Sequence, residues 1–133
     1  MDKQLNDLDG PIKQIENYQN SGDHMTADIM LKGLCSKLRD IIEKSIETTL
    51  LSNIVSRYAR NISSEKIRYL KAIKETDVDY IDSMMSKYSK YDHSQSNEKP
   101  VSLPSIDEFK EDVKTINDWY NGFKKQLKKY DNM

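Results

Sequence analysis

The chain has 133 residues, of which 36% are hydrophobic and 32% charged, and its 21 basic and 22 acidic residues give a net charge of −1. This length supports one modest core, so we expect a single domain over residues 1–133. The balanced charge excludes a global field that would hold the chain on nucleic acid or on an anionic membrane.

The first predicted helix follows an apolar stripe with helical spacing. Its members are Leu5, Leu8, Ile12 and Ile15. Asp9-Gly10-Pro11 cuts across the stripe and leaves two alternatives: a kinked helix, or a frayed lead-in over 1–10 followed by a helix over 11–19. Residues 20–23 form a turn in which Gly22 suits a left-handed cap.

A long second helix is predicted over 24–52, with a length of roughly 40 Å. Its apolar stripe is Ala27, Leu31, Leu34, Leu38 and Ile41, widened by Met30, Cys35, Ile42 and Ile46. A hinge-like connection over 53–61 and a short helix over 64–73 follow. A further helix over 76–91 opens with a capping sequence and has Val78, Ile81, Met84, Met85 and Tyr88 on its inner side. Two prolines and polar turn-formers make 92–104 a loop.

The last helix, predicted over 105–130, has the strongest periodicity in the chain. Ser105 and Glu108 form a capping box at its start. Its apolar residues alternate spacings of three and four: Ile106, Phe109, Val113, Ile116, Tyr120, Phe123, Leu127 and Tyr130. Acidic residues crowd its start and four lysines crowd its end, which suits the helix dipole.

These elements predict an all-α helical bundle. We expect the long helices 24–52 and 105–130 to pack side by side in a coiled-coil-like manner, with the shorter helices between them. A charge at Phe109 or Ile116 should be severely destabilising. If the last stripe is longer than its partner within the chain covers, its end over 120–130 would pair between chains and form a homo-oligomer.

The cysteine content and hydropathy predict a location. Cys35 is the only cysteine, which excludes an internal disulfide. The first residues lead into no apolar run, and no stretch approaches the roughly 20 apolar residues of a membrane span. We therefore expect a cytoplasmic protein with a buried, reduced thiol at Cys35 and no membrane contact.

Catalytic and cofactor signatures are missing from the sequence. It has no glycine-rich phosphate loop, His-Glu-x-x-His or Cys-x-x-Cys. One cysteine and two distant histidines do not suit a structural zinc site. Asp92-His93-Ser94 places three catalytic residue types side by side, but adjacent residues rarely face one another as a triad does. We expect no enzyme activity, cofactor or metal.

Aromatic residues provide the first candidate binding site. Rings with a polar tip are favoured at interfaces, and Tyr88, Tyr91 and Trp119 together exceed what so small a core is expected to bury. Trp119 is the leading candidate for a partner contact, with packing at the flank of the core as the alternative. His93, in the loop after Tyr91, completes this candidate surface.

A basic stretch provides the second candidate, for nucleic-acid binding. Its members are Arg57, Arg60, Lys66, Arg68, Lys71 and Lys74. Only Glu65 opposes them, so residues 57–74 have a balance of +5. A nucleic-acid backbone or an acidic partner surface would need this arrangement, whereas a solvated face compensated by acidic neighbours in space is the alternative.

One ordered series of motifs spans residues 14–125. It comprises Ser21-Gly22-Asp23, the helix Leu34 to Leu51 with Arg39, Glu43 and Glu47, the run Val55-Ser56-Arg57-Tyr58, the loop Tyr88 to His93, and Pro100 to Pro104 before the helix with Trp119. In this order the motifs resemble the C-terminal helical region of RecF-like, ABC-type bacterial AAA ATPases of phage-defence systems. The ATPase residues of that family would lie in a preceding part, so the resemblance implies no catalytic residue here.

The resemblance implies a stand-alone or mimicking helical tail that docks on an ATPase body, a nucleic acid or a second protein. We therefore expect a non-enzymatic protein–protein interaction module that acts through Trp119 and the loop 88–104. The alternatives are a nucleic-acid-binding helical protein that uses residues 57–74, and a small phage or mobile-element inhibitor of a host enzyme.

Overall fold

The structure is a computed structural model that describes residues 1–58, 60–93 and 102–131, with the side chains of residues 92 and 93 outside that description. Every regular element in these ranges is a helix, as the sequence predicts. The elements are α1 (Asp2–Asn6), α2 (Asp9–Asn20), α3 (His24–Ser45), the π-helical turn η1 (Ile46–Leu50), the 3₁₀ helix η2 (Ser64–Ala72), α4 (Glu75–His93) and α5 (Ile106–Lys128).

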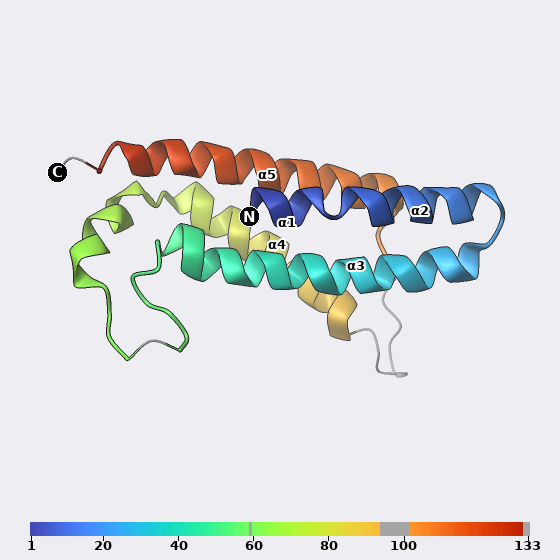
Figure 1. The fold of residues 1–133 in the computed structure, drawn as a ribbon, viewed down its shortest axis with the longest axis horizontal. Helices are drawn as coiled ribbons and strands as arrows, with labels where there is room; N and C mark the ends of the chain where they lie inside the picture. The colour runs from blue at the N-terminus through green and yellow to red at the C-terminus, as the bar shows by residue number, and fades with distance from the viewer. Residues whose placement is uncertain (59, 94–101, 132–133) are drawn as a thin grey trace.

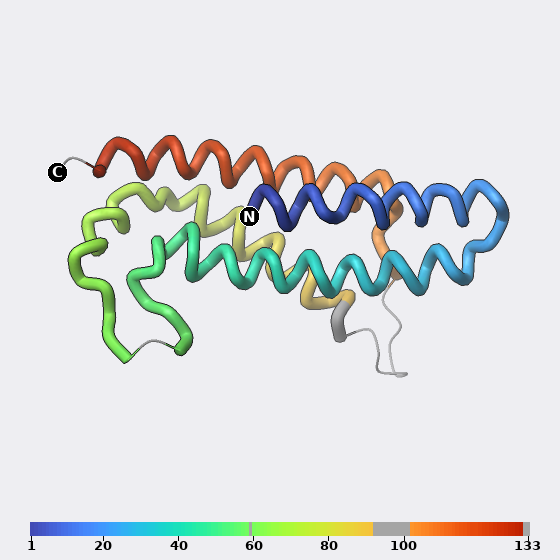
Figure 2. The backbone as a smooth tube through the Cα atoms, viewed as in Figure 1, coloured from blue at the N-terminus to red at the C-terminus, as the bar shows by residue number. Residues whose placement is uncertain are grey.

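The helices form an elongated bundle in which successive long elements reverse direction. α2 and α3 make an antiparallel hairpin, α4 crosses α3 obliquely, and α5 returns along the other side of the bundle (Figure 1). The α2–α3 turn lies at one end. The connection between α3 and α4 lies at the other end, together with the C-terminus (Figure 2). The bundle therefore presents two different ends.

The amino-terminal stripe follows the kinked-helix alternative. Leu5 and Leu8 are only 2% and 0% exposed, so both belong to the core. The backbone N–H of Ile12 donates to the carbonyl of Leu8, which carries the helical path from α1 into α2 across the interruption. This burial explains why residues before Pro11 stay helical although the sequence breaks there.

The α2–α3 turn is closed by the residues that the sequence indicates. Gly22 has a φ of +88°, a left-handed conformation that favours glycine. Asp23 then caps α3, because its carboxylate accepts from the backbone N–H and the hydroxyl of Thr26. α3 ends at Ser45 and passes into η1, so the helix predicted to Ser52 is shorter and finishes in a π-helical turn.

α3 packs mainly against α2 and α4, and its contact with α5 is slight. The predicted helix 24–52 corresponds to α3 and η1, and α5 contacts both of them, so the two long helices lie against each other although α3 packs more closely on α2 and α4. Coiled-coil packing stays a prediction. The short turn between α2 and α3 makes these two helices antiparallel neighbours, whereas α4 follows α3 through a long connection. α3 and α5 instead run in the same direction, with α4 between them in the chain.

The inner face of α4 matches the prediction at Ile81, Met84, Met85 and Tyr88 and differs at its first position. Val78 was expected inside but is 48% exposed, and Asp77 is buried in its place. The Asp77 carboxylate accepts from the backbone N–H of Lys74 at 2.9 Å and so caps the start of α4. The inward row is therefore Asp77, Ile81 and Tyr88, which keeps helical spacing with a polar residue at its first position.

The core is one apolar cluster that includes residues of both long stripes. Phe109 and Ile116 of α5 are fully buried, as are Leu38 and Ile42 of α3. Phe109 also meets the ring of Tyr88 edge-on, with centroids 6.1 Å apart. The α5 stripe therefore forms the apolar wall on which α4 and the α1–α2 segment pack.

Phe109→Ala is expected to lower the free energy of unfolding by about 3–5 kcal/mol, because it removes a fully buried ring between α4 and α5. Urea unfolding followed by circular dichroism measures this change. Glu111→Ala, at an exposed position of the same helix, is the control and should change it by less than about 0.5 kcal/mol. Similar effects of the two substitutions would contradict this packing.

Candidate functional site

The aromatic residues predicted to contact a partner are inside the fold. Tyr88 is 0% exposed and Tyr91 is 9% exposed, and their rings pack edge-on at 5.6 Å. The expectation that these two rings lie on a contact surface is therefore wrong. The core holds them because the hydroxyl of Tyr88 finds a carboxylate partner, which removes the cost of burying it. The side chain of His93 lies outside the described residues, as do residues 94–101 of the predicted loop.

The partner of Tyr88 is a polar cluster that joins α4 to α5. The Tyr88 hydroxyl donates to Asp112 at 2.5 Å, and the Lys87 ammonium donates to Asp112 at 2.7 Å and to Glu108 at 2.8 Å. Burial, together with the hydrogen bond to Asp112, raises the pKa of Tyr88. The phenol therefore keeps its proton and acts as a structural donor, not as an acid or base.

Trp119 is half-buried and serves the fold. Its indole N–H donates to the Asp77 carboxylate at 3.0 Å, and its ring stacks on Phe123 with centroids 5.3 Å apart. The alternative of packing at the flank of the core therefore describes its position, and a partner contact through Trp119 stays a prediction. Trp119 ties α5 to the start of α4 through Asp77, which already caps that helix.

Trp119→Phe is expected to lower the free energy of unfolding by about 1–3 kcal/mol, because the buried Asp77 carboxylate loses its indole donor. A double-mutant cycle with Asp77→Ala, measured by urea unfolding, separates this hydrogen bond from the loss of ring area. Strictly additive effects of the two substitutions would contradict the assignment.

The cysteine of the chain is also structural. Cys35 is 0% exposed on α3, and burial raises the pKa of its thiol to about 12. The thiolate is the reactive form, so the folded chain offers almost none of it near neutral pH.

At about pH 8, close to the ordinary thiol pKa of about 8.5, Cys35 should react with a disulfide reagent only as fast as the chain opens. Spectrophotometric labelling with and without urea measures this. The unfolded chain should label at the rate of a free thiol. Equally rapid labelling of the native chain would contradict the burial of Cys35.

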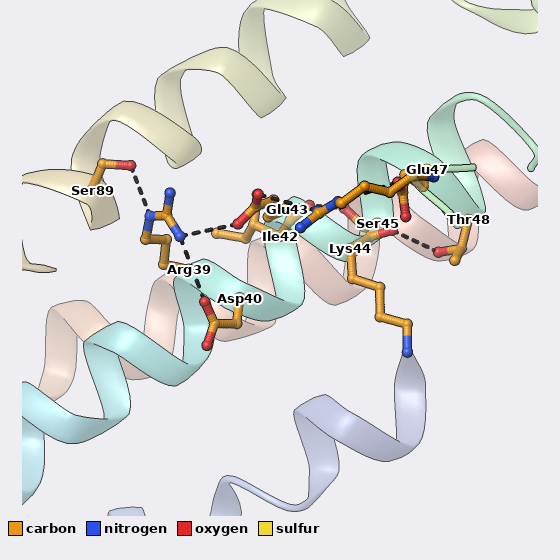
Figure 3. A network of polar contacts seen from close by, with 10 residues as sticks. Arg39, Asp40, Ile42, Glu43, Lys44, Ser45, Glu47, Thr48 and Ser89 are labelled. Atoms are coloured by element: carbon orange, nitrogen blue, oxygen red, sulfur yellow. Dashed lines mark hydrogen bonds and ion pairs between the residues drawn. The ribbon is translucent and has the colours of Figure 1, made fainter. Parts of the chain in front are cut away.

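The residues of the basic stretch differ in their surroundings, because Arg57 forms ion pairs within the fold. Arg57 is paired with Glu43 at 3.2 Å and Glu47 at 3.5 Å, and its backbone N–H donates to Glu47. Proximity to these carboxylates raises the pKa of Arg57. Figure 3 shows Glu43 of α3 and Glu47 of η1 beside each other, and Glu43 also belongs to a network that continues through Arg39 to Ser89 of α4. Arg57 therefore matches the alternative in which acidic neighbours compensate the basic residue.

The other basic residues of the stretch have varied surroundings. Arg60, Lys71 and Lys74 are exposed, and Lys66 is half-buried. Arg68 lies with its guanidinium 5.3 Å from the centre of the Tyr69 ring. Arg57 therefore attaches its segment of the chain to Glu43 and Glu47, whereas Arg60, Lys71 and Lys74 face solvent.

A connecting arm, residues 51–73, joins η1 to α4 and contains η2. It projects from one end of the bundle (Figure 2). Five of the nine large apolar side chains that the described residues leave exposed lie in this arm. They are Val55, Tyr58, Ile62, Ile67 and Leu70. Sequence reasoning missed this group, and the signal available was an apolar content without helical periodicity after Asn53.

The arm is fixed to the bundle at both ends. Ile54 is buried, and its carbonyl accepts from the backbone N–H of Ser63 at 2.8 Å, which closes the loop between them. Further along, the Tyr69 hydroxyl donates to Asp131 at 2.9 Å, and the Tyr130 hydroxyl donates to the carbonyl of Lys71. These hydrogen bonds therefore hold the backbone of the arm in place on the bundle.

The turn into the arm uses left-handed backbone. Ser52 and Asn53 have φ values of +51° and +59°, a region that residues other than glycine occupy uncommonly. The backbone N–H of Asn53 donates to the carbonyl of Glu47 at 2.7 Å. This turn redirects the chain out of η1 and sets where the exposed residues begin.

The described residues contain no group of three or more side chains placed to hold a metal ion. None of the helices described is long and apolar enough to cross a membrane. No family model, curated protein or solved structure matches the chain. The five exposed apolar side chains make the arm the candidate site.

Proposed function

We propose that the chain is a non-enzymatic helical module that docks on a partner protein through the connecting arm. The observation that carries the proposal is the set of five exposed apolar side chains in this arm. Single exposed apolar residues are ordinary, but a group of them in one segment is typical of an interaction site. Tyr58 is the extreme case, because 92% of it is exposed.

The fixed backbone of the arm supports the same proposal. A surface that is already ordered loses less conformational entropy on binding than a flexible segment does. The pairing of Arg57 with Glu43 and Glu47 holds the first half of the arm, and Tyr69 with Asp131 holds the second. The bundle then acts as a rigid scaffold that presents Tyr58 and Ile62.

The partner class comes from the resemblance to helical tails of bacterial defence ATPases. We propose an ATPase subunit or another enzyme in the cytoplasm as the docking partner, with activation and inhibition both compatible with the surface. A second copy of the chain is a weaker candidate. η2 covers the end of the α5 stripe, where Phe123 is buried and Tyr130 contacts Lys71, so that end is not left open for pairing between chains.

Tyr58→Ser/Ile62→Ser/Ile67→Ser should abolish docking, because it removes the exposed apolar area of the arm. These residues are exposed, so the free energy of unfolding should change by no more than about 1 kcal/mol. Quantitative mass spectrometry of proteins captured by the tagged chain, from cells that naturally express it, measures the loss. A recovered partner should fall at least about tenfold, the equivalent of 1.4 kcal/mol.

The matched control is Tyr18→Ser/Met25→Ser/Ile29→Ser, which removes three exposed apolar side chains at the opposite end of the bundle. It should retain the partner. Retention of that partner by the arm variant, or its loss in the control variant alone, would refute docking through the arm. Light scattering of the purified chain distinguishes docking on another protein from self-association.

A further inference from the structure

The fold brings two basic segments together that lie far apart in the sequence. η2 contacts α5, and the hydrogen bonds from Tyr69 to Asp131 and from Tyr130 to Lys71 fix the two segments at one end of the bundle. Figure 1 shows the arm and the C-terminal end of α5 on this same side. The lysines that end α5 therefore join the solvent-facing residues of the basic stretch.

The combined segments 60–74 and 120–131, here called the basic end, are strongly positive. Their basic residues are Arg60, Lys66, Arg68, Lys71, Lys74, Lys124, Lys125, Lys128 and Lys129. Nine basic residues face two acidic ones, Glu65 and Asp131, which gives +7. The remainder of the chain holds twelve basic and twenty acidic residues, which gives −8. The net charge of −1 therefore conceals a large separation of charge.

Six of these basic residues, the four lysines over 124–129 with Lys71 and Lys74, make no ion pair with a described carboxylate. Elsewhere in the described residues, Arg39, Arg57, Lys87 and Lys110 form ion pairs with carboxylates. Lys124 instead lies 5.1 Å from the centre of the Tyr120 ring. Asp131 already accepts a hydrogen bond from Tyr69.

The helix dipole accounts for only part of the lysine cluster. The C-terminus of a helix carries roughly half a negative charge, which one lysine in the last turn more than offsets. α5 has four lysines within six residues, at spacings that place 124 with 128 and 125 with 129 along one side. All four are exposed. The positive charge of these lysines beyond what offsets the helix dipole is therefore available to an external anion.

We propose that the basic end binds the phosphate backbone of a nucleic acid. A row of lysines suits closely spaced phosphates, because each ammonium contacts one phosphate as a point charge. Lysine is depleted in protein interfaces, which disfavours an acidic protein as the partner. Residues 121, 122, 124, 125, 128 and 129 of α5 are exposed and none is apolar, so this face lacks the apolar residues of a membrane-surface helix.

Fluorescence anisotropy of a labelled DNA duplex and of its single strand tests the proposal between about 50 and 200 mM salt. Lys124→Gln/Lys125→Gln/Lys128→Gln/Lys129→Gln should weaken binding at least about tenfold at the lower salt concentration. The dependence of log K on log salt should lose roughly one unit of slope for each phosphate contact removed. These lysines lie outside the docking arm, so this outcome is independent of the proposed protein docking.

The matched control is Lys3→Gln/Lys13→Gln/Lys37→Gln/Lys114→Gln, which removes four exposed lysines elsewhere and gives the same net charge. It should bind within about threefold of the unaltered chain, because only long-range attraction changes. Equal losses in both variants would overturn the assignment to this end. No binding by the unaltered chain at about 50 mM salt, or binding only to phosphatidylserine vesicles, would overturn the proposal itself.

Discussion

Large aromatic side chains of α4 and the apolar stripe of α5 meet in one seam, and the remaining structure depends on it. Tyr88 is fully buried against Phe109. Its hydroxyl can be buried because it donates a hydrogen bond to the carboxylate of Asp112. Leaving that hydroxyl without a partner would cost about 1–3 kcal/mol. Nearer the start of α4, the indole N–H of Trp119 likewise donates a hydrogen bond to the carboxylate of Asp77. Each polar tip thus lets a large ring contribute to a core of limited size.

This seam explains why the two ends of the bundle differ. The α2–α3 turn is short, with Gly22 and Asp23 closing it. The link from α3 to α4 is long, because α4 has to cross α3 and reach α5. Five large apolar side chains of this link are exposed, while polar contacts at Arg57 and Tyr69 hold its backbone. The arm and the α5 lysines therefore gather at one end, as a product of the same topology.

The sequence predicted α5 closely because its periodicity, its Ser105 cap and its charged ends all agree. It was misleading for Tyr88 and left the position of Trp119 open, because an amphipathic ring suits an interface and a core equally, and only the fold reveals the carboxylate beside it. The ion pairs of Arg57 could not be predicted for a similar reason, since Glu43 and Glu47 approach it only after the chain turns at Asn53. The sequence predicted a short helix over 64–73, close to η2, but the segment after Asn53 has no helical periodicity, so the exposed apolar group of the arm could not be predicted.

The central claim is that the arm touches the partner while the bundle supports it. A photo-crosslinking amino acid placed at position 58, compared with one at position 25, measures that contact in the cells that express the chain. Met25 is the matched site, because it is 76% exposed and lies at the opposite end. The account predicts a covalent adduct with one partner protein from position 58 and none from position 25. An adduct from position 25 alone would contradict it.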